Sequence, residues 1–268
     1  MTTHDQRPAV LVLAGHDPTG GAGMQADIET LHSHGCQAAC VITALTAQNT
    51  HRVAHVRPQS QADFAEQLAL LAEDMNFNAC KIGVCPDPDL IVHIAAFLRQ
   101  QPELPVVLDP VLIAGCGDNF LDTEMHHYLR EQLLPLARII TPNAQEARQL
   151  SGRIDLAEAA AELLAAGAHS VLITGGDEPT QNNQQESVQN VFYQHQTTPM
   201  SYRYTRLPGR FHGSGCTLSA AIAANLALGR SLPVAVAQAQ DYTWRCLEAA
   251  QAYGSEQLHP CRIAATDR

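Results

Sequence analysis

The sequence His212-Gly213-Ser214-Gly215-Cys216-Thr217 runs directly into the helix-forming segment 218–224. Two glycines flank a serine, so the backbone N–H groups of Gly213, Ser214, Gly215 and Cys216 can converge on one point, and the following helix adds the positive end of its dipole. The stretch predicts an anion-binding cradle with a thiol at its centre. A helix N-terminus can lower the pKa of a cysteine toward neutrality, so Cys216 is a candidate base or hydrogen-bond acceptor. The alternative is a small thiol that only packs.

The amino-acid composition limits which kinds of molecule the protein can bind. The chain has 268 residues, of which 46% are hydrophobic, so it can bury a full core, and we expect one domain over 1–268. A formal net charge of −11 argues against nucleic acid and anionic membranes, which require clustered basic residues. Lys81 is the only lysine, and no Gly-Lys-Ser/Thr sequence is present, which excludes a P-loop.

The cysteines and the N-terminus indicate a compartment. Eight cysteines occur without a C-x-x-C pair or zinc-like spacing. Residues 1–8 are polar, lack the apolar core of a signal peptide and are expected to form a flexible tail. No apolar run approaches the roughly 20 residues of a membrane-spanning helix. We therefore expect a reduced, cytoplasmic protein.

Short apolar runs alternate with helical patterns along the chain, which favours right-handed crossovers and a three-layer α/β/α sandwich around a mainly parallel sheet. A small antiparallel hairpin is expected late in the chain. The expected strands are 9–14, 40–43, 79–82, 106–108, 138–140 and 171–173, with the hairpin at 188–193 and 200–207. The expected helices are 23–34, 61–75, 87–99, 123–133, 143–150, 156–166, 215–228 and 234–252.

Unusual residues follow the expected strands, at the edge where such sheets bind ligands. Asp109 ends an apolar strand, where an unpaired acid is costly unless it has a function. Glu146 lies at the start of a helix behind Asn143, so its carboxylate is equally compatible with helix capping and with function. Both carboxylates can face the ligand edge and hold Mg²⁺, which prefers a few carboxylates, water and phosphates.

The first glycine-rich loop has a rival interpretation. Gly21-x-Gly23-x-x-Ala26 fits a dinucleotide-binding pattern between a strand and a helix. No acidic residue follows the second strand to hold a ribose, however, and the loop before Gly21 is too long for the tight turn. The alternative is a turn with glycines at positive φ, followed by Asp27 as an ordinary acid in the first turn of the helix.

Six separated motifs together resemble one family over nearly the whole chain. They are Ala14-Gly15-His16-Asp17-Pro18-Thr19-Gly20-Gly21-Ala22-Gly23-Met24-Gln25-Ala26-Asp27, Val41-Ile42-Thr43-Ala44-Leu45-Thr46-Ala47-Gln48-Asn49-Thr50, Lys81-Ile82-Gly83, Leu108-Asp109-Pro110-Val111, Ile140-Thr141-Pro142-Asn143, and the stretch from His212 to Ala221. With these motifs the chain resembles the hydroxymethylpyrimidine/phosphomethylpyrimidine kinases of thiamine biosynthesis, in the ribokinase-like superfamily.

The resemblance implies ATP, Mg²⁺ and successive phosphorylation of 4-amino-5-hydroxymethyl-2-methylpyrimidine and its monophosphate. It implies that Gln48 binds the aminopyrimidine edge, that Asp27 lies by the acceptor group, and that the cradle holds the transferring phosphoryl group. Further residues implied are Gly15, Val84 and Val111 around the ring, Asp109 and Glu146 at the metal, and Asp109, Asn143, Glu146, Thr174, Gly176 and Arg210 at ATP. A homodimer is also implied.

The sequence departs from the family pattern in three places. Gly115 and Thr174 occupy positions where many relatives have lysine, and Val84 replaces a frequent methionine. Arg210, and less directly Arg206, can supply a missing positive charge. The alternatives are a pyridoxal or pyridoxine kinase of the same superfamily, or a non-catalytic vitamin-binding relative; the Ala47-Gln48-Asn49 segment favours the aminopyrimidine.

Overall fold

The computed structural model describes residues 7–112, 123–178 and 187–263. Most of the expected N-terminal tail, and Gly115, lie outside the described residues. None of the helices within the described ranges is both long and apolar enough to cross a membrane.

One nine-stranded sheet organises the chain, in the order β3-β2-β1-β4-β5-β6-β7-β8-β9. The five pairings from β2 to β7 are parallel, whereas β3, β8 and β9 run antiparallel to their neighbours. The mainly parallel sheet and the late hairpin are confirmed. The strands are β1 (Ala9–His16), β2 (Gln37–Gln48), β3 (Val53–Pro58), β4 (Ala79–Ile82), β5 (Val106–Leu108), β6 (Ile139–Ile140), β7 (Ser170–Ile173), β8 (Ser187–Gln194) and β9 (Met200–Thr205).

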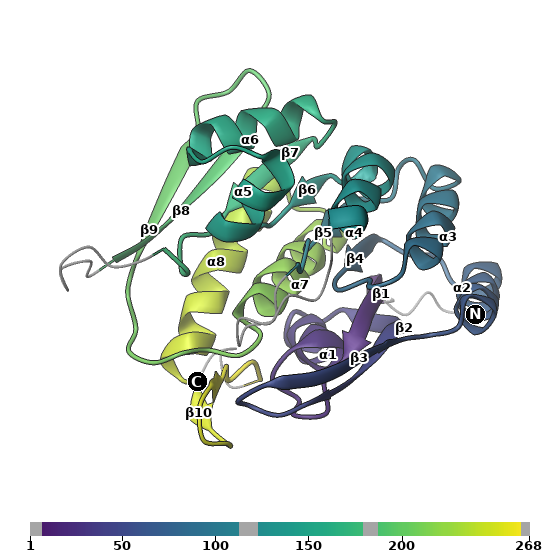
Figure 1. Ribbon diagram of the computed structural model, residues 1–268, viewed down its shortest axis with the longest axis horizontal. Helices are drawn as coiled ribbons and strands as arrows, with labels where there is room; N and C mark the ends of the chain where they lie inside the picture. Colours follow the sequence, from purple (N-terminus) through teal and green to yellow (C-terminus); the bar gives the residue numbers. More distant parts are fainter. Residues whose placement is uncertain (1–6, 113–122, 179–186, 264–268) are drawn as a thin grey trace.

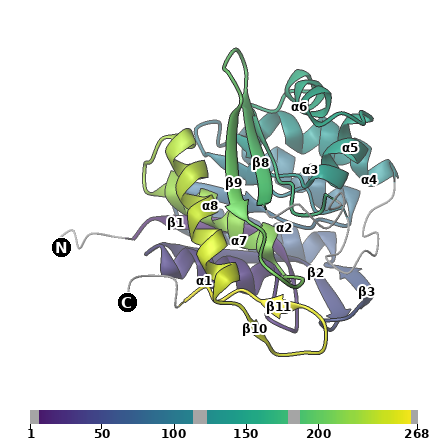
Figure 2. The same cartoon turned by 90° about the vertical axis from the view of Figure 1, so that its left-hand side faces the viewer.

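Helices cover both faces of the sheet, which gives the expected three layers (Figures 1 and 2). One face packs on α1 (Gly23–Ser33), α7 (Ser214–Ala227) and α8 (Leu232–Glu248). The other packs on α2 (Gln61–Asp74), α3 (Pro88–Arg99), α4 (Thr123–Tyr128), α5 (Ala144–Ser151) and α6 (Leu156–Ala165). In β1, Val10 and Val12 join one core while Leu11 and Leu13 join the other, because successive side chains point to opposite faces. A strand buried on both faces therefore reads as a continuous apolar run.

The α-helix expected at 123–133 is shorter than predicted. It ends at Tyr128 and continues as a π-helical turn, Leu129–Leu133, and a 3₁₀ turn, Leu134–Leu136. Pro135 lies within the 3₁₀ turn, where its lack of an N–H prevents the α-helical hydrogen bonding from continuing.

The second strand is three times as long as expected and forms a hairpin that the sequence analysis missed. β2 continues to Gln48 and pairs with β3 as far as Gln48 opposite Val53. The turn is closed by Asn49, whose side-chain oxygen accepts the N–H groups of His51 and Arg52 at 2.9 Å. Gln48 thus lies at the end of a projecting two-stranded ribbon.

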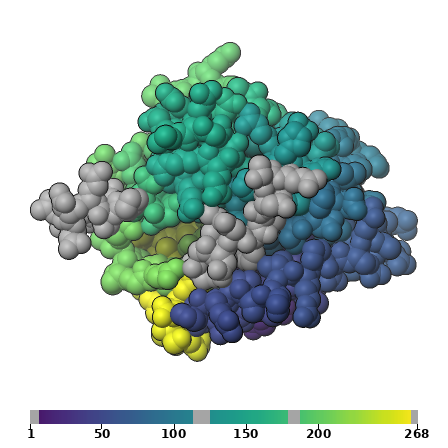
Figure 3. All heavy atoms as spheres, viewed as in Figure 1, coloured from purple at the N-terminus to yellow at the C-terminus, as the bar shows by residue number. Residues whose placement is uncertain are grey.

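A second small hairpin was also missed. The last helix ends at Glu248, not near residue 252, and β10 (Gln251–Ala252) then pairs with β11 (Leu258–His259). Its loop contacts the β2–β3 turn, since a side chain at Gly254 would meet Thr50. Figure 3 shows the β2–β3 hairpin and these C-terminal residues side by side along one edge of the molecule.

Candidate active site

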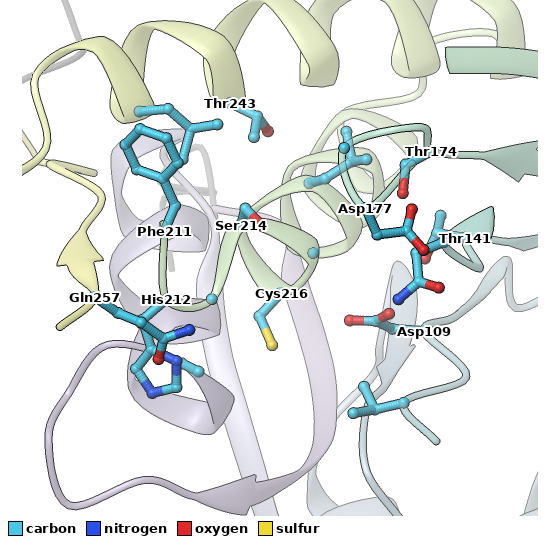
Figure 4. A pocket seen from close by; sticks show the side chains of 18 of the residues that line it. Asp109, Thr141, Thr174, Asp177, Phe211, His212, Ser214, Cys216, Thr243 and Gln257 are labelled. Carbon is cyan, nitrogen blue, oxygen red and sulfur yellow. The ribbon is translucent and has the colours of Figure 1, made fainter. Parts of the chain in front are cut away.

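A cavity of about 720 Å³ lies along the carboxyl ends of the parallel strands. Its wall combines residues from the ends of β1, β2 and β4 to β7 with the loop before α7 (Figure 4). Fourteen of the residues singled out from the sequence lie on this wall: Gly15, Gln48, Val84, Asp109, Val111, Asn143, Glu146, Thr174, Gly176, Arg210, Gly213, Ser214, Gly215 and Cys216. Residues more than 190 positions apart in sequence are therefore brought to one space.

The cradle loop depends on a close contact between two glycines. Gly213 precedes α7 with φ +75°, and a Cβ there would lie 2.1 Å from the carbonyl oxygen of Gly21. Only glycine fits both constraints. The Thr217 N–H and hydroxyl both donate to the carbonyl of Gly213, at 2.9 and 2.8 Å. The first N–H groups of α7 have no partner within the helix and are available to an anion in the cavity.

Asp17 ties the first loop to the cradle loop. Its carboxylate accepts hydrogen bonds from the N–H groups of Thr19 and Ala22 and contacts Nε2 of His212 at 2.7 Å. Burial would raise the pKa of Asp17, but the hydrogen bond and charge of His212, together with Thr19, lower it to about 2. Gly20 and Gly23 have positive φ, in agreement with the turn interpretation of this loop. This pair was not expected from the sequence, where His212 was given no role of its own.

Asp27 does not face the cavity, contrary to the expectation that it lies by the acceptor group. It is fully buried in α1 and its carboxylate lies 2.9 Å from Nζ of Lys81, which is also fully buried. Burial raises the pKa of Asp27 to about 6 although Lys81 pulls it down. Burial lowers the pKa of Lys81, but the charges of Asp27, Cys216 and Asp109 together with the hydrogen bond to Asp27 raise it above its ordinary value.

Lys81 itself borders the cavity and was missed as a site residue. Its charge lowers the pKa of both Asp109 and Cys216. The sequence did contain a signal that could have identified Lys81, namely a lone lysine inside the apolar run Ala79-Cys80-Lys81-Ile82. A charged side chain on a strand that is buried on both faces requires a partner.

The expectation of a low pKa at Cys216 is wrong for the free protein. Burial raises the pKa of the thiol to about 12; Lys81 and the N–H of Gly23 lower it, while Asp109 and Asp27 add to the rise. Desolvation and two carboxylates thus outweigh the helix dipole. Figure 4 shows Cys216 projecting from the start of α7 on the side toward which the Asp109 carboxylate points. The thiol is close enough to lower the pKa of Asp109.

Asp109, Glu146 and Asp177 form an acidic side of the cavity. Burial, followed by the charge of Asp109, raises the pKa of Glu146 to about 8, and burial also raises the pKa of Asp109. Glu146 and Asn143 form a reciprocal capping box at the start of α5, so the capping interpretation holds for both. Asp177 accepts the N–H groups of Ala144 and Gln145 at the same helix start.

The residues expected at ATP gather beyond this acidic side. Thr174 and Asn143 form an isolated parallel β-bridge. The guanidinium of Arg206 donates to the carbonyl of Gly176 at 3.1 Å. Arg206 and Arg210 both border the cavity. Three aromatic residues on the wall, Tyr204, Phe211 and Trp244, were not singled out from the sequence.

Comparison with known proteins agrees with this arrangement. The family model described as phosphomethylpyrimidine kinase matches residues 17–260. The chain belongs to the phosphomethylpyrimidine kinase family. The resemblance stated from the motifs is thereby confirmed.

Three relatives of this phosphomethylpyrimidine kinase family member illustrate the match. The hydroxymethylpyrimidine/phosphomethylpyrimidine kinase of Rhizobium meliloti is 39% identical over 252 residues, covering 90% of each chain. The pyridoxal kinase of Bacillus subtilis, solved as an ADP complex, superposes with a TM-score of 0.87 at 31% identity, covering 95% of this chain and 97% of that one. The phosphomethylpyrimidine kinase of Clostridium difficile 630 superposes with a TM-score of 0.75 at 32% identity, covering 88% of this chain and 98% of that one.

The buried Lys81–Asp27 pair of this family member yields a stability prediction. In Lys81→Met the Asp27 carboxylate stays buried without its partner, so we expect the free energy of unfolding to fall by about 3–5 kcal/mol. The double variant Asp27→Asn/Lys81→Met removes both charges and should recover roughly half of that loss. Urea unfolding of the two single variants and the double variant gives the coupling energy. Strictly additive losses would contradict a direct ion pair.

Proposed function

We propose that the chain is an ATP- and Mg²⁺-dependent kinase, acting as a single domain, that phosphorylates 4-amino-5-hydroxymethyl-2-methylpyrimidine and then its monophosphate to the diphosphate. The observation that carries the proposal is the N–H cradle at the start of α7, which shares one cavity with Asp109 and with Gln48. Family membership supports phosphoryl transfer as the reaction. Such transfer needs mainly positioning and charge neutralisation, and both are available in this cavity.

The acceptor side is the end of the cavity formed by β1, β2 and β4. A Cβ at Gly15 would lie 2.7 Å from Cγ1 of Val84, so the apolar Val84 side chain packs directly against the Gly15 backbone on this wall. Val111 borders the same cavity. The carboxamide of Gln48 can donate to a ring nitrogen and accept from an amino group, which is the pairing that an aminopyrimidine edge requires. Asp27 has no part in this proposal, because its carboxylate is committed to Lys81.

On the donor side, we assign the polyphosphate of ATP to Asn143, Thr174, Gly176 and Arg210. The acidic pair Asp109 and Glu146 fits Mg²⁺, since two buried carboxylates with raised pKa values carry a repulsion that a divalent cation relieves. When bound, the ion would neutralise developing charge on the phosphoryl oxygens. Both Glu146 oxygens already accept backbone N–H groups, so Asp109 has more free capacity.

Transfer itself falls to the cradle and Cys216. The N–H groups from Gly213 to Cys216 would hold the oxygens of the phosphoryl group as it moves. A neutral alcohol must lose a proton during the first transfer, whereas the phosphate acceptor of the second is already largely dianionic. We assign proton removal to Cys216: the hydroxyl proton passes to sulfur as the thiol proton passes to the Asp109 oxygen that does not hold the ion.

The same proposal includes the homodimer that the resemblance implies and the cytoplasmic compartment expected from the cysteines and the N-terminus. An apolar side chain on the outer half of β2 supports a partner surface there, since Leu45 is 44% exposed. The seven described cysteines are all free thiols, as a reducing compartment requires.

The direct test is a coupled assay of ADP release with the pyrimidine alcohol, its monophosphate and pyridoxal as separate acceptors. We expect both pyrimidines to be phosphorylated, and activity to vanish with EDTA and return with Mg²⁺. ³¹P NMR of the products distinguishes transfer from ATP hydrolysis. A preference for pyridoxal would favour the vitamin B6 alternative that the structural relatives raise, and no turnover with any acceptor would favour a binding protein.

Gln48→Ala tests the pyrimidine pocket. We expect KM for the pyrimidine alcohol to rise about tenfold, because one or two hydrogen bonds are lost, while KM for ATP changes little. Gln48→Glu is the matched control, since it keeps the shape but loses the donor. An equal rise in both KM values would mean that the residue serves the hairpin and not the substrate.

Cys216→Ala tests the role of the thiol in proton transfer. We expect kcat for the alcohol to fall by about 10²–10⁴ and kcat for the monophosphate to fall much less, because only the alcohol has a proton to lose. Cys216→Ser retains a transferable proton at this position, so its kcat for the alcohol should lie between the values of wild type and Cys216→Ala. Equal losses in the two steps would limit Cys216 to the geometry of the cradle.

A further inference from the structure

Arg262 is an arginine that the proposed reaction leaves without a role, although it is only 2% exposed. It lies three residues beyond β11, in the segment that follows the C-terminal hairpin. Burying a guanidinium is costly unless its N–H donors form hydrogen bonds, and the acceptors of this guanidinium indicate what it does.

The donors of Arg262 end on the two loops of the candidate active site. Nε donates to the Thr217 hydroxyl at 2.9 Å, and one terminal nitrogen donates to the carbonyl of Gly21. The other donates to the Glu29 carboxylate at 3.1 Å and to the carbonyl of Gly20 at 3.5 Å. One planar side chain thus joins the first glycine loop, helix α1 and the first turn of α7.

Two of these contacts converge on the place where the loops touch. The Thr217 hydroxyl that accepts from Arg262 donates in turn to the carbonyl of Gly213 at 2.8 Å. The carbonyl of Gly21 held by Arg262 is the atom that a Cβ at Gly213 would strike. Arg262 therefore holds Gly21 directly and Gly213 through one hydroxyl, on both sides of their contact.

The backbone of Arg262 is itself fixed. Its carbonyl accepts hydrogen bonds from the hydroxyls of Ser33 in α1 and Tyr242 in α8, each at 2.8 Å. The preceding N–H, of Cys261, donates to the carbonyl of Cys246 at 3.0 Å. Because the backbone of Arg262 is anchored to α1 and α8, the position of its guanidinium does not depend on the two loops alone.

We propose that Arg262 is a positioning residue of the phosphoryl-transfer site: by bridging the Gly21 carbonyl and the Thr217–Gly213 link, it sets the position of the cradle N–H groups. The proposal rests on the kinase function proposed above. A cradle stabilises a transition state only where its donors are held in place, and a misplacement of about 1 Å can cost on the order of 10²-fold in rate. Substrate affinity depends on the far walls of the cavity and is left nearly unchanged.

The experiment compares Arg262→Met and Arg262→Lys with Glu29→Gln, which removes the charge of a partner of the same guanidinium but touches neither loop. We expect kcat of Arg262→Met to fall on the order of 10²-fold in both phosphorylations, with both KM values within about twofold of wild type. Arg262→Lys keeps the charge but cannot reach three partners, so it should restore only part of kcat. Glu29→Gln should keep kcat near wild type.

Hydrogen exchange provides a readout that does not depend on turnover. In Arg262→Met, peptides covering 17–23 and 212–218 should exchange faster, while those covering β4 to β6 exchange as in wild type. Should wild type fail to phosphorylate the pyrimidine, the proposed function fails while this comparison still tests Arg262. Faster exchange throughout the chain, unchanged exchange in both loops, or an equal loss of kcat in Glu29→Gln would overturn the proposal.

Thr217→Val is a second variant for the case in which Arg262→Met does not fold. It removes the hydroxyl link and keeps the guanidinium with its other partners, so kcat should fall about tenfold without a matching change in KM. Thr217→Ser keeps the hydroxyl and should lose less than Thr217→Val. Identical losses in the two variants would show that the link has no role.

Discussion

The carbonyl oxygen of Gly21 and the Cα of Gly213 are so close that no side chain fits between them. This contact joins a loop that follows the first strand to a loop that precedes the seventh helix. Gly213 adopts a left-handed conformation there and starts α7 in a direction that exposes its first N–H groups to the cavity. The Asp17–His212 pair and the Arg262 donors all act on the same junction. The geometry of the cradle therefore depends on two glycines that have no side chains at their contact. Neighbouring buried charged residues then hold the two loops in place.

Those buried charges explain how so acidic a chain can build a site for anions. The chain has a net charge of −11, whereas Lys81 and Arg262, the buried lysine and arginine among the described residues, are each paired with a carboxylate. Lys81 is held by Asp27, and Arg262 is held partly by Glu29. Their fields still reach the site, because burial weakens screening by water. The electrostatics of the cradle thus come from local pairs and from the α7 dipole.

Much of this arrangement was predictable. Runs such as residues 9–14 are apolar because both faces of their strand are covered, and alternation with helices leads to a parallel sheet. The carboxyl ends of those strands share one edge, so Asp109, Asn143 and Thr174 were expected together and do lie on one wall. The β2–β3 hairpin was not predicted, because its outer half alternates weakly between partly and fully exposed residues. The two-residue strands β10 and β11 carry no periodic signal at all.

The sequence by itself determined most of the elements of the central sheet and of its helical layers, their order, the edge that bears the chemistry and the family, since each of these follows from local composition and short motifs. Only the tertiary structure decided which charges meet. It paired Asp27 with Lys81 and kept Asp27 off the cavity wall, and it placed the half-buried Cys216 near two carboxylates that raise the pKa of its thiol. It also brought Arg262 to a glycine 241 positions earlier in the chain. Pairing of this kind depends on distance and desolvation, and neither quantity is encoded within any one stretch of sequence.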